Sequence, residues 1–138
     1  MLQLAGRFAD NVWRVQAGYN VVTGIWPLVH MPSFEAISGP KTDRWLVKTV
    51  GAVVGVNGGV IAVAGANDRI TPEIVGLAIG SGASLAAMDV FYVSRGRISR
   101  VYLLDALAEF LFIAGWIVRW RRARADSVTD STGISQGV

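Results

Sequence analysis

The stretch YLLDALAEFLFIAGWIVRW, from Tyr102 to Trp120, decides the fold class. It is apolar enough to enter a bilayer, yet it contains Asp105 and Glu109. These acids are four residues apart and therefore share one face of a helix. Three other apolar stretches approach the roughly 20 residues that a helix needs to cross a bilayer. The sequence therefore predicts an all-α membrane protein with an acidic interior.

The composition supports this prediction. Of the 138 residues, 52% are hydrophobic and only 17% are charged, whereas an average soluble domain has about 25% charged residues. The mean hydropathy is +0.44. The alternative is a soluble helical domain with a large core, and the number of near-span-length apolar stretches argues against it.

The residue types also exclude several kinds of site. The chain has no cysteine and a single histidine, His30, which excludes disulfides, thiolate metal sites and multi-histidine metal sites within one chain. No motif indicates a cofactor. The net charge of +3 could suggest nucleic acid, but an arginine cluster directly after the last apolar stretch is typical of a cytoplasmic membrane anchor. This cluster consists of Arg119, Arg121, Arg122 and Arg124.

We expect an antiparallel transmembrane four-helix bundle, because short connections favour antiparallel neighbours. The expected spans are residues 12–29, 45–64, 73–93 and 101–119. Residues 1–11 form an amphipathic lead-in that either lies on the membrane surface or extends the first helix. A short interfacial helix between the first two spans should be capped by Ser33 and ended by Gly39. Residues 121–138 are polar and are expected to be disordered.

Two helices carry stripes of small residues, which allow helix backbones to approach closely. The second span has Gly51, Gly55, Gly58 and Ala62, including a Gly-x-x-x-Gly pattern. The third span has Gly76, Gly80, Ala83 and Ala87, and Asp89 points away from that stripe. We therefore expect the third helix to pack tightly by the small-residue face and to present its acid on another face.

The acids are expected to meet between the third and fourth spans. Asp89 and Asp105 lie eight residues on either side of Arg97, at the centre of the connecting loop. In an antiparallel hairpin they should have a similar depth, about 6–12 Å from the loop, with Glu109 about one turn deeper. The candidate ligand- or ion-binding residues are these three acids with Asn20, Asn57 and Lys48 as accessory groups.

Each acid at mid-membrane costs about 2.5–3.5 kcal/mol on insertion scales. Such residues need a partner, a watery cavity or a proton, so the leading hypothesis is an intramembrane acidic pocket that binds a proton, a cation or a small amphipathic ligand. The alternative is a purely structural role, in which Asp89 and Asp105 pair with Arg97, Arg100 or Lys48 and stabilise the bundle.

Two other functions remain open. The protein could be an accessory or scaffold subunit of a larger membrane complex, with the glycine stripes as partner surfaces, or a homo-oligomer. It could also be a small membrane enzyme that acts on lipid or sterol, with the carboxylates as acid and base. No motif names a reaction, so a non-enzymatic role is favoured.

The segment from Gly39 to Gly51, GPKTDRWLVKTVG, resembles a block in small uncharacterised bacterial four-helix membrane proteins. With AMDVFY, residues 87–92, the resemblance extends over residues 13–118. It implies a four-span fold in the bacterial inner membrane and brings no activity with it. Orientation is nearly balanced: seven of the 13 lysines and arginines fall on the side of the termini. The dense arginine cluster favours cytoplasmic termini, and antiparallel dimers of opposite orientation remain the alternative.

Overall fold

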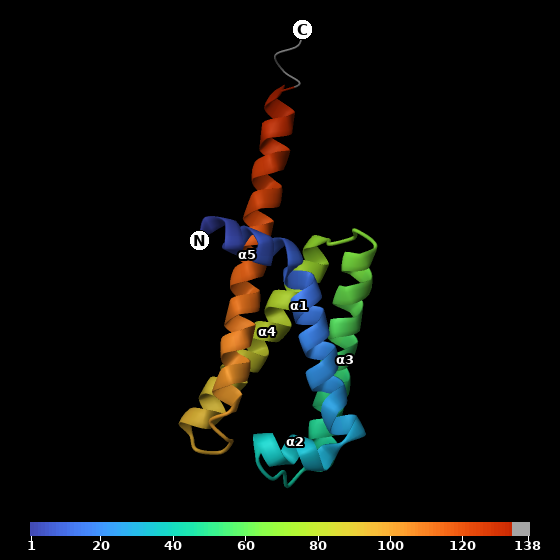
Figure 1. Cartoon of the computed structure of the whole chain (residues 1–138), viewed down its shortest axis with the longest axis vertical. Coiled ribbons are helices and arrows are strands. Elements are labelled where there is room, and N and C mark those ends of the chain that lie inside the picture. The colour runs from blue at the N-terminus through green and yellow to red at the C-terminus, as the bar shows by residue number, and fades with distance from the viewer. Residues whose placement is uncertain (134–138) are drawn as a thin grey trace.

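The computed structural model of the chain describes residues 1–133, and in this part all regular structure is helical. Its five helices are α1 (Leu2–Val29), α2 (Met31–Ser38), α3 (Arg44–Ala66), α4 (Pro72–Ser94) and α5 (Tyr102–Gly133). The four long helices alternate in direction along the chain, and the short α2 lies across one end of them (Figure 1). The all-helical prediction with a short helix after the first long one is confirmed.

The long helices are arranged as two pairs. α1 packs mainly against α3, α4 packs mainly against α5, and α1 also contacts α5 and so joins the pairs. The start of α1 and the 67–71 turn lie at one end of the molecule, whereas α2 and the 95–101 loop lie at the other (Figure 1). This topology brings α1, α4 and α5 around a common interior.

Two of the helices, α3 and α4, are long and apolar enough to cross a membrane. Among the described helices, α1 and α5 do not meet the same test of length and composition. Both carry polar residues within their length, such as Gln16 and Asn20 in α1. Four apolar spans were expected, and length and composition thus support two of them.

The small-residue face of α3 packs directly on α1. A Cβ atom added to Gly24 of α1 would lie 2.5 Å from the carbonyl oxygen of Gly51, and one added to Gly51 would lie 2.5 Å from the carbonyl oxygen of Gly24. Two turns beyond Gly51 on α3, a Cβ on Gly58 would lie 2.8 Å from Cβ of Asn20. Only glycine therefore permits this approach of the two backbones, as the stripe in the sequence indicated.

The small-residue stripe of α4 differs from the prediction. Gly76, Gly80, Ala83 and Ala87 are all exposed, and no atom lies within 4 Å of a Cβ added to Gly76 or Gly80. The buried residues of α4 are instead Val75, Ala78, Gly82, Ala86 and Asp89. Small residues occur on both faces of this helix, so their pattern did not identify the face that packs. The acid lies on the packed face, not opposite to it.

The ends of α2 are defined by local contacts, and the expected cap was wrong. The N-cap residue is His30, whose Nδ1 accepts a hydrogen bond of 3.2 Å from the backbone N–H of Ser33. Ser33 uses its own hydroxyl differently, because Oγ accepts a 2.7 Å hydrogen bond from Nε1 of Trp26 in α1. Gly39 ends the helix with φ +86°, as expected.

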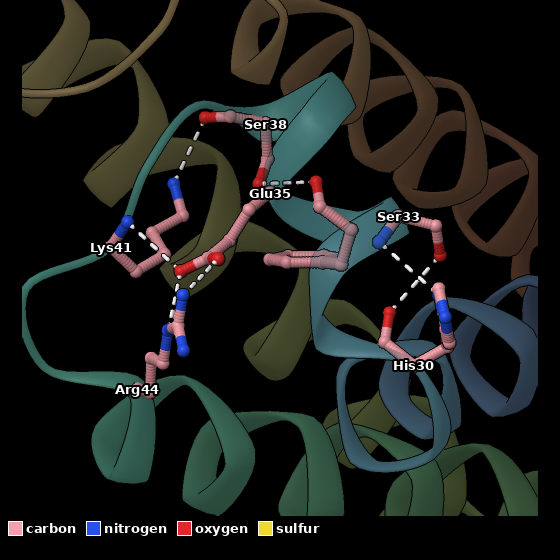
Figure 2. A network of polar contacts seen from close by, with 7 residues as sticks. His30, Ser33, Glu35, Ser38, Lys41 and Arg44 are labelled. Carbon is pink, nitrogen blue, oxygen red and sulfur yellow. Dashed lines mark hydrogen bonds and ion pairs between the residues drawn. The ribbon is translucent and has the colours of Figure 1, made fainter.

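An ion pair then fastens α2 to the start of α3 (Figure 2). Nε and Nη2 of Arg44 donate to the two carboxylate oxygens of Glu35 at 2.9 and 2.7 Å. The backbone N–H of Lys41 donates to the same carboxylate at 3.2 Å. Hydrogen bonding from Arg44 holds the pKa of Glu35 below its ordinary value.

The last helix is longer than predicted. The fourth span was expected to end at residue 119 and to be followed by a disordered tail, but α5 remains helical through Gly133 and extends beyond the rest of the molecule (Figure 1). Arginine and alanine, which dominate residues 119–125, are strong helix formers and favour continuation of the helix, and Arg119 and Arg122 also contact Asp10 of α1. Residues 134–138 of the predicted tail lie outside the described residues. At the other terminus, residues 2–11 are the first part of α1.

Candidate functional site

Four polar side chains of α1, α4 and α5 are buried at the contacts between the long helices. Their exposed fractions are 0% for Gln16, 2% for Asn20, 8% for Asp89 and 1% for Glu109. The nearby core is apolar and includes Val12, Ala78, Phe112 and Trp116. Buried polar groups are costly unless they are hydrogen-bonded, so it matters which of these side chains have hydrogen-bond partners and which do not.

Gln16 links three helices. Its side-chain N–H donates to the carbonyl oxygen of Ala78 in α4 at 3.1 Å. Its Oε1 accepts a hydrogen bond of 2.6 Å from the indole N–H of Trp116 in α5. The amide of Gln16 is therefore held in one orientation, and it also lies beside the carboxyl group of Glu109.

Glu109 extends toward a space that a glycine leaves open. A Cβ atom added to Gly82 of α4 would lie 2.5 Å from Oε2 of Glu109 and 3.7 Å from Nε2 of Gln16. Oε2 itself is buried and has no hydrogen-bond partner. Gly82 thus supplies room for a carboxylate oxygen that the protein leaves unpaired.

Asp89 and Asp105 form the second part of the cluster, at neighbouring positions of α4 and α5. The two carboxyl groups lie within hydrogen-bonding reach of each other, and the hydroxyl of Tyr19 in α1 donates to Oδ1 of Asp105. Asp105 is half-buried, whereas Oδ2 of Asp89 is buried without a partner. Tyr19 is close enough to interact electrostatically with Asp89, Asp105 and Glu109, so the three acids form one cluster.

No basic side chain neutralises this cluster in the part of the chain that the structure describes. The ion pairs found there are Arg44–Glu35 and Arg122–Asp10, both away from the three acids. The alternative in which Asp89 and Asp105 are clasped by Arg97, Arg100 or Lys48 is therefore not what the structure contains. Two carboxyl groups in contact without a counter-charge require a proton or a cation between them.

The three accessory residues differ in their burial. Lys48 is exposed and Asn57 is half-buried on α3, and among residues 1–127 neither forms a hydrogen bond or ion pair with the acids. Asn20 is buried against Gly58 of α3, and its Oδ1 has no hydrogen-bond partner. The structure thus brings together the three predicted acids, and it separates Lys48 from them.

Sequence reasoning missed three members of the site, namely Gln16, Tyr19 and Gly82. A signal for two of them was present, because Gln16, Tyr19 and Asn20 occur at positions i, i+3 and i+4 and hence share one face of α1. Gly82 had no such signal, since its role depends on a contact between α4 and α5.

The arrangement favours acceptance of a proton or of a small cation. Three buried oxygen atoms, Oδ1 of Asn20, Oδ2 of Asp89 and Oε2 of Glu109, are acceptors without donors. Within the described residues, no group of three or more His, Cys, Asp or Glu side chains is arranged to hold a metal ion. At the two carboxyl oxygens, a proton or a cation that also donates hydrogen bonds fits better than a metal with several carboxylate ligands.

Comparison of the chain with protein-family models, with curated proteins and with solved structures finds no match.

Proposed function

We propose that the protein is a multi-pass membrane protein whose buried carboxyl cluster binds a proton or a small cation, in transport or in ligand binding. The observation that supports this most strongly is that polar side chains are buried whereas large apolar side chains are exposed, the reverse of the distribution in a soluble protein. Large apolar residues are exposed on each of the four long helices, for example Val22 (66%), Val56 (65%), Phe91 (48%) and Leu104 (67%). Soluble monomers rarely expose apolar surface on this scale.

The same inversion favours α1 and α5 as further spans. Their polar residues Gln16, Asn20 and Glu109 are turned inward. The exposed residues of α1 are apolar from position 15 to 29, and those of α5 from position 103 to 117, so a bilayer would meet a hydrophobic surface on these parts of both helices. The arginines of the α5 extension favour cytoplasmic termini. The resemblance of residues 39–51 described above supports a bacterial inner membrane as the location.

The carboxyl cluster supplies the chemistry. Ionisable residues inside a membrane are costly and mark ion or proton pathways when they face the protein interior. Here Asp89 and Glu109 are buried and Asp105 is half-buried. Among the described side chains none of the three is paired with a base, and Asp89 and Glu109 each have an oxygen without a donor. In a purely structural role these acceptors would keep the free-energy cost of burial without a hydrogen bond. This cost favours occupation of the cluster by a proton or a cation.

The test uses the purified protein in proteoliposomes that contain a pH-sensitive dye. We expect pH-driven or cation-driven flux in the wild type and its loss in Asp105→Asn and Glu109→Gln. Asp126→Asn, an exposed acid on the α5 extension, is the matched control and should behave as the wild type does. Infrared bands of protonated carboxyl groups provide a second readout for binding without transport. Unchanged flux and unchanged carboxyl bands in both site variants would refute the proposal.

One observation favours a second candidate, an accessory subunit of a larger membrane complex. The small-residue stripe of α4 has open space over Gly76 and Gly80, as a helix–helix contact with another chain requires. Gly80→Leu should then lower the size of the particle isolated in mild detergent, while acid substitutions leave that size unchanged. A wild-type protein that is monomeric in native detergent would exclude this candidate.

A further inference from the structure

A second feature that suggests binding lies at the beginning of α4, near the 67–71 turn, and shares no residue with the carboxyl cluster. It is an open groove of about 560 Å³ between the second half of α3 and the beginning of α4. Its lining residues are Val56, Gly59, Val60, Val63, Ala64, Arg69, Thr71 and Ile74. The volume falls within the roughly 300–1,000 Å³ of typical ligand pockets.

The groove is elongated and has one polar end. The α3 residues from Val56 to Ala64 follow one face of the helix for about 12 Å, and this wall is apolar throughout. A Cβ atom added to Gly59 would have no neighbour within 4 Å, so this glycine deepens the wall. The polar lining residues, Arg69 and Thr71, both belong to the turn at the end of α3. The shape suits a chain-like ligand with one polar end.

Arg69 is the positive group at that end. Its backbone is fixed, because its N–H donates to the carbonyl oxygen of Ala64 at 2.8 Å and its own carbonyl accepts from Thr71 at 3.1 Å. Its side chain is exposed, and none of the ion pairs among the described side chains includes it. An anion at this end would therefore find a guanidinium free to bind it.

The N-terminus of α4 does not serve as the anion site. The carboxylate of Glu73 already lies in the first turn of that helix. Negative charge at that helix end is thus supplied by the protein itself. Recognition of a ligand anion is left to Arg69.

We propose that this groove binds an anionic phospholipid of the surrounding bilayer, with an acyl chain along α3 and the phosphate on Arg69. When α3 and α4 span the membrane, the turn between them lies at the headgroup level and the valines of α3 lie at the depth of the acyl chains. The charge of Arg69 selects anionic over zwitterionic lipid. The inference depends on membrane placement of α3 and α4 and is independent of the carboxyl cluster.

The charge is tested with nanodiscs of phosphatidylcholine alone or mixed in equal parts with phosphatidylglycerol, followed by native mass spectrometry of the released protein. The wild type should retain phosphatidylglycerol selectively. Arg69→Gln should bind it roughly tenfold more weakly, because one charge-assisted contact is lost. Arg97→Gln, in the loop at the other end of the molecule, is the matched control and should retain wild-type binding.

The apolar wall is tested by filling it. Gly59→Leu should displace the acyl chain and abolish selective retention without an internal clash, since no atom lies within 4 Å of the new Cβ. Gly18→Leu on α1 has the same open surroundings and should leave retention unchanged. Equal retention of both lipids by the wild type, an equal loss in Arg69→Gln and Arg97→Gln, or full retention in Gly59→Leu would each overturn the proposal. Lipid selectivity is measured separately from flux, so either proposal can fail alone.

Discussion

Replacement of Gly24 by alanine should separate the two helices that carry the α1–α3 contact. The new Cβ would lie 2.5 Å from the carbonyl oxygen of Gly51 and 2.6 Å from the backbone nitrogen of Gly55, whereas ordinary contact begins at 3.4 Å. Both obstacles are backbone atoms, so the helices must move apart by nearly an ångström and lose contacts along their interface. Overpacking of this kind costs about 1–3 kcal/mol.

Gly18→Ala in the same helix is the matched control, because no atom lies within 4 Å of its Cβ position. Both substitutions gain the same helix propensity, about 1 kcal/mol for glycine to alanine. The difference between the two variants therefore isolates the steric cost, and Gly24→Ala should be less stable than Gly18→Ala by about 1–3 kcal/mol.

The assay is unfolding in mixed micelles with increasing denaturing detergent, followed by circular dichroism. Gly18→Ala should be as stable as the wild type or more stable. Equal free energies of unfolding for the two variants would show that α1 and α3 do not approach each other as closely as the structure has them, and would refute the reasoning.

Three further perturbations follow from local contacts. Gln16→Leu leaves the indole N–H of Trp116 buried without an acceptor and should lower the free energy of unfolding by about 1–3 kcal/mol in the same assay. The pKa of Glu35 is lowered in the folded protein. The stabilisation by Arg44 is therefore present above the ordinary value of 4.5 and is lost as the pH falls through the lowered pKa. The protection of the α2 amides against hydrogen exchange should fall over that range in the wild type, and the same fall in a Glu35→Gln variant would contradict this. His30→Ala removes the N-cap acceptor of α2 and should destabilise that helix by about 0.5–2 kcal/mol, measured as faster exchange of its first amides, while protection of α4 stays unchanged.

The contrast between the two small-residue stripes bears on how such patterns are used. The small-residue stripe of α3 is buried within the chain, because Gly51 and Gly58 contact the backbone or side chains of α1. On α4 the stripe is free. For the proposed accessory-subunit role, α4 is therefore the surface to test, whereas substitutions at Gly51 or Gly58 of α3 report on the α1–α3 contact within the chain.

The local sequence by itself determined several helix ends, although not the start of α2 or the end of α5. Pro72 after Thr71 starts α4, Gly39 stops α2, and alternation of long apolar stretches with short polar turns separates the long helices, since these signals act through backbone conformation and nearest neighbours. The proximity of Asp89 to Asp105 also followed from the sequence, because the two residues are equally spaced from the loop of a hairpin. The high helix propensities of residues 119–125 favour continuation of α5 beyond residue 119, but the prediction of a disordered tail was based on their polarity.

Only the tertiary structure decided which faces meet. The packed face of α4 carries Asp89 and Gly82, and the choice depended on the complementary surfaces of α5 and α1, not on the α4 sequence. The same holds for Gln16, whose donor and acceptor groups are matched by Ala78 and Trp116 from elements 62 and 100 residues away. Helix periodicity defines which residues share a face, but the orientation of that face is settled by contacts between segments distant in the chain, and these have no local signature.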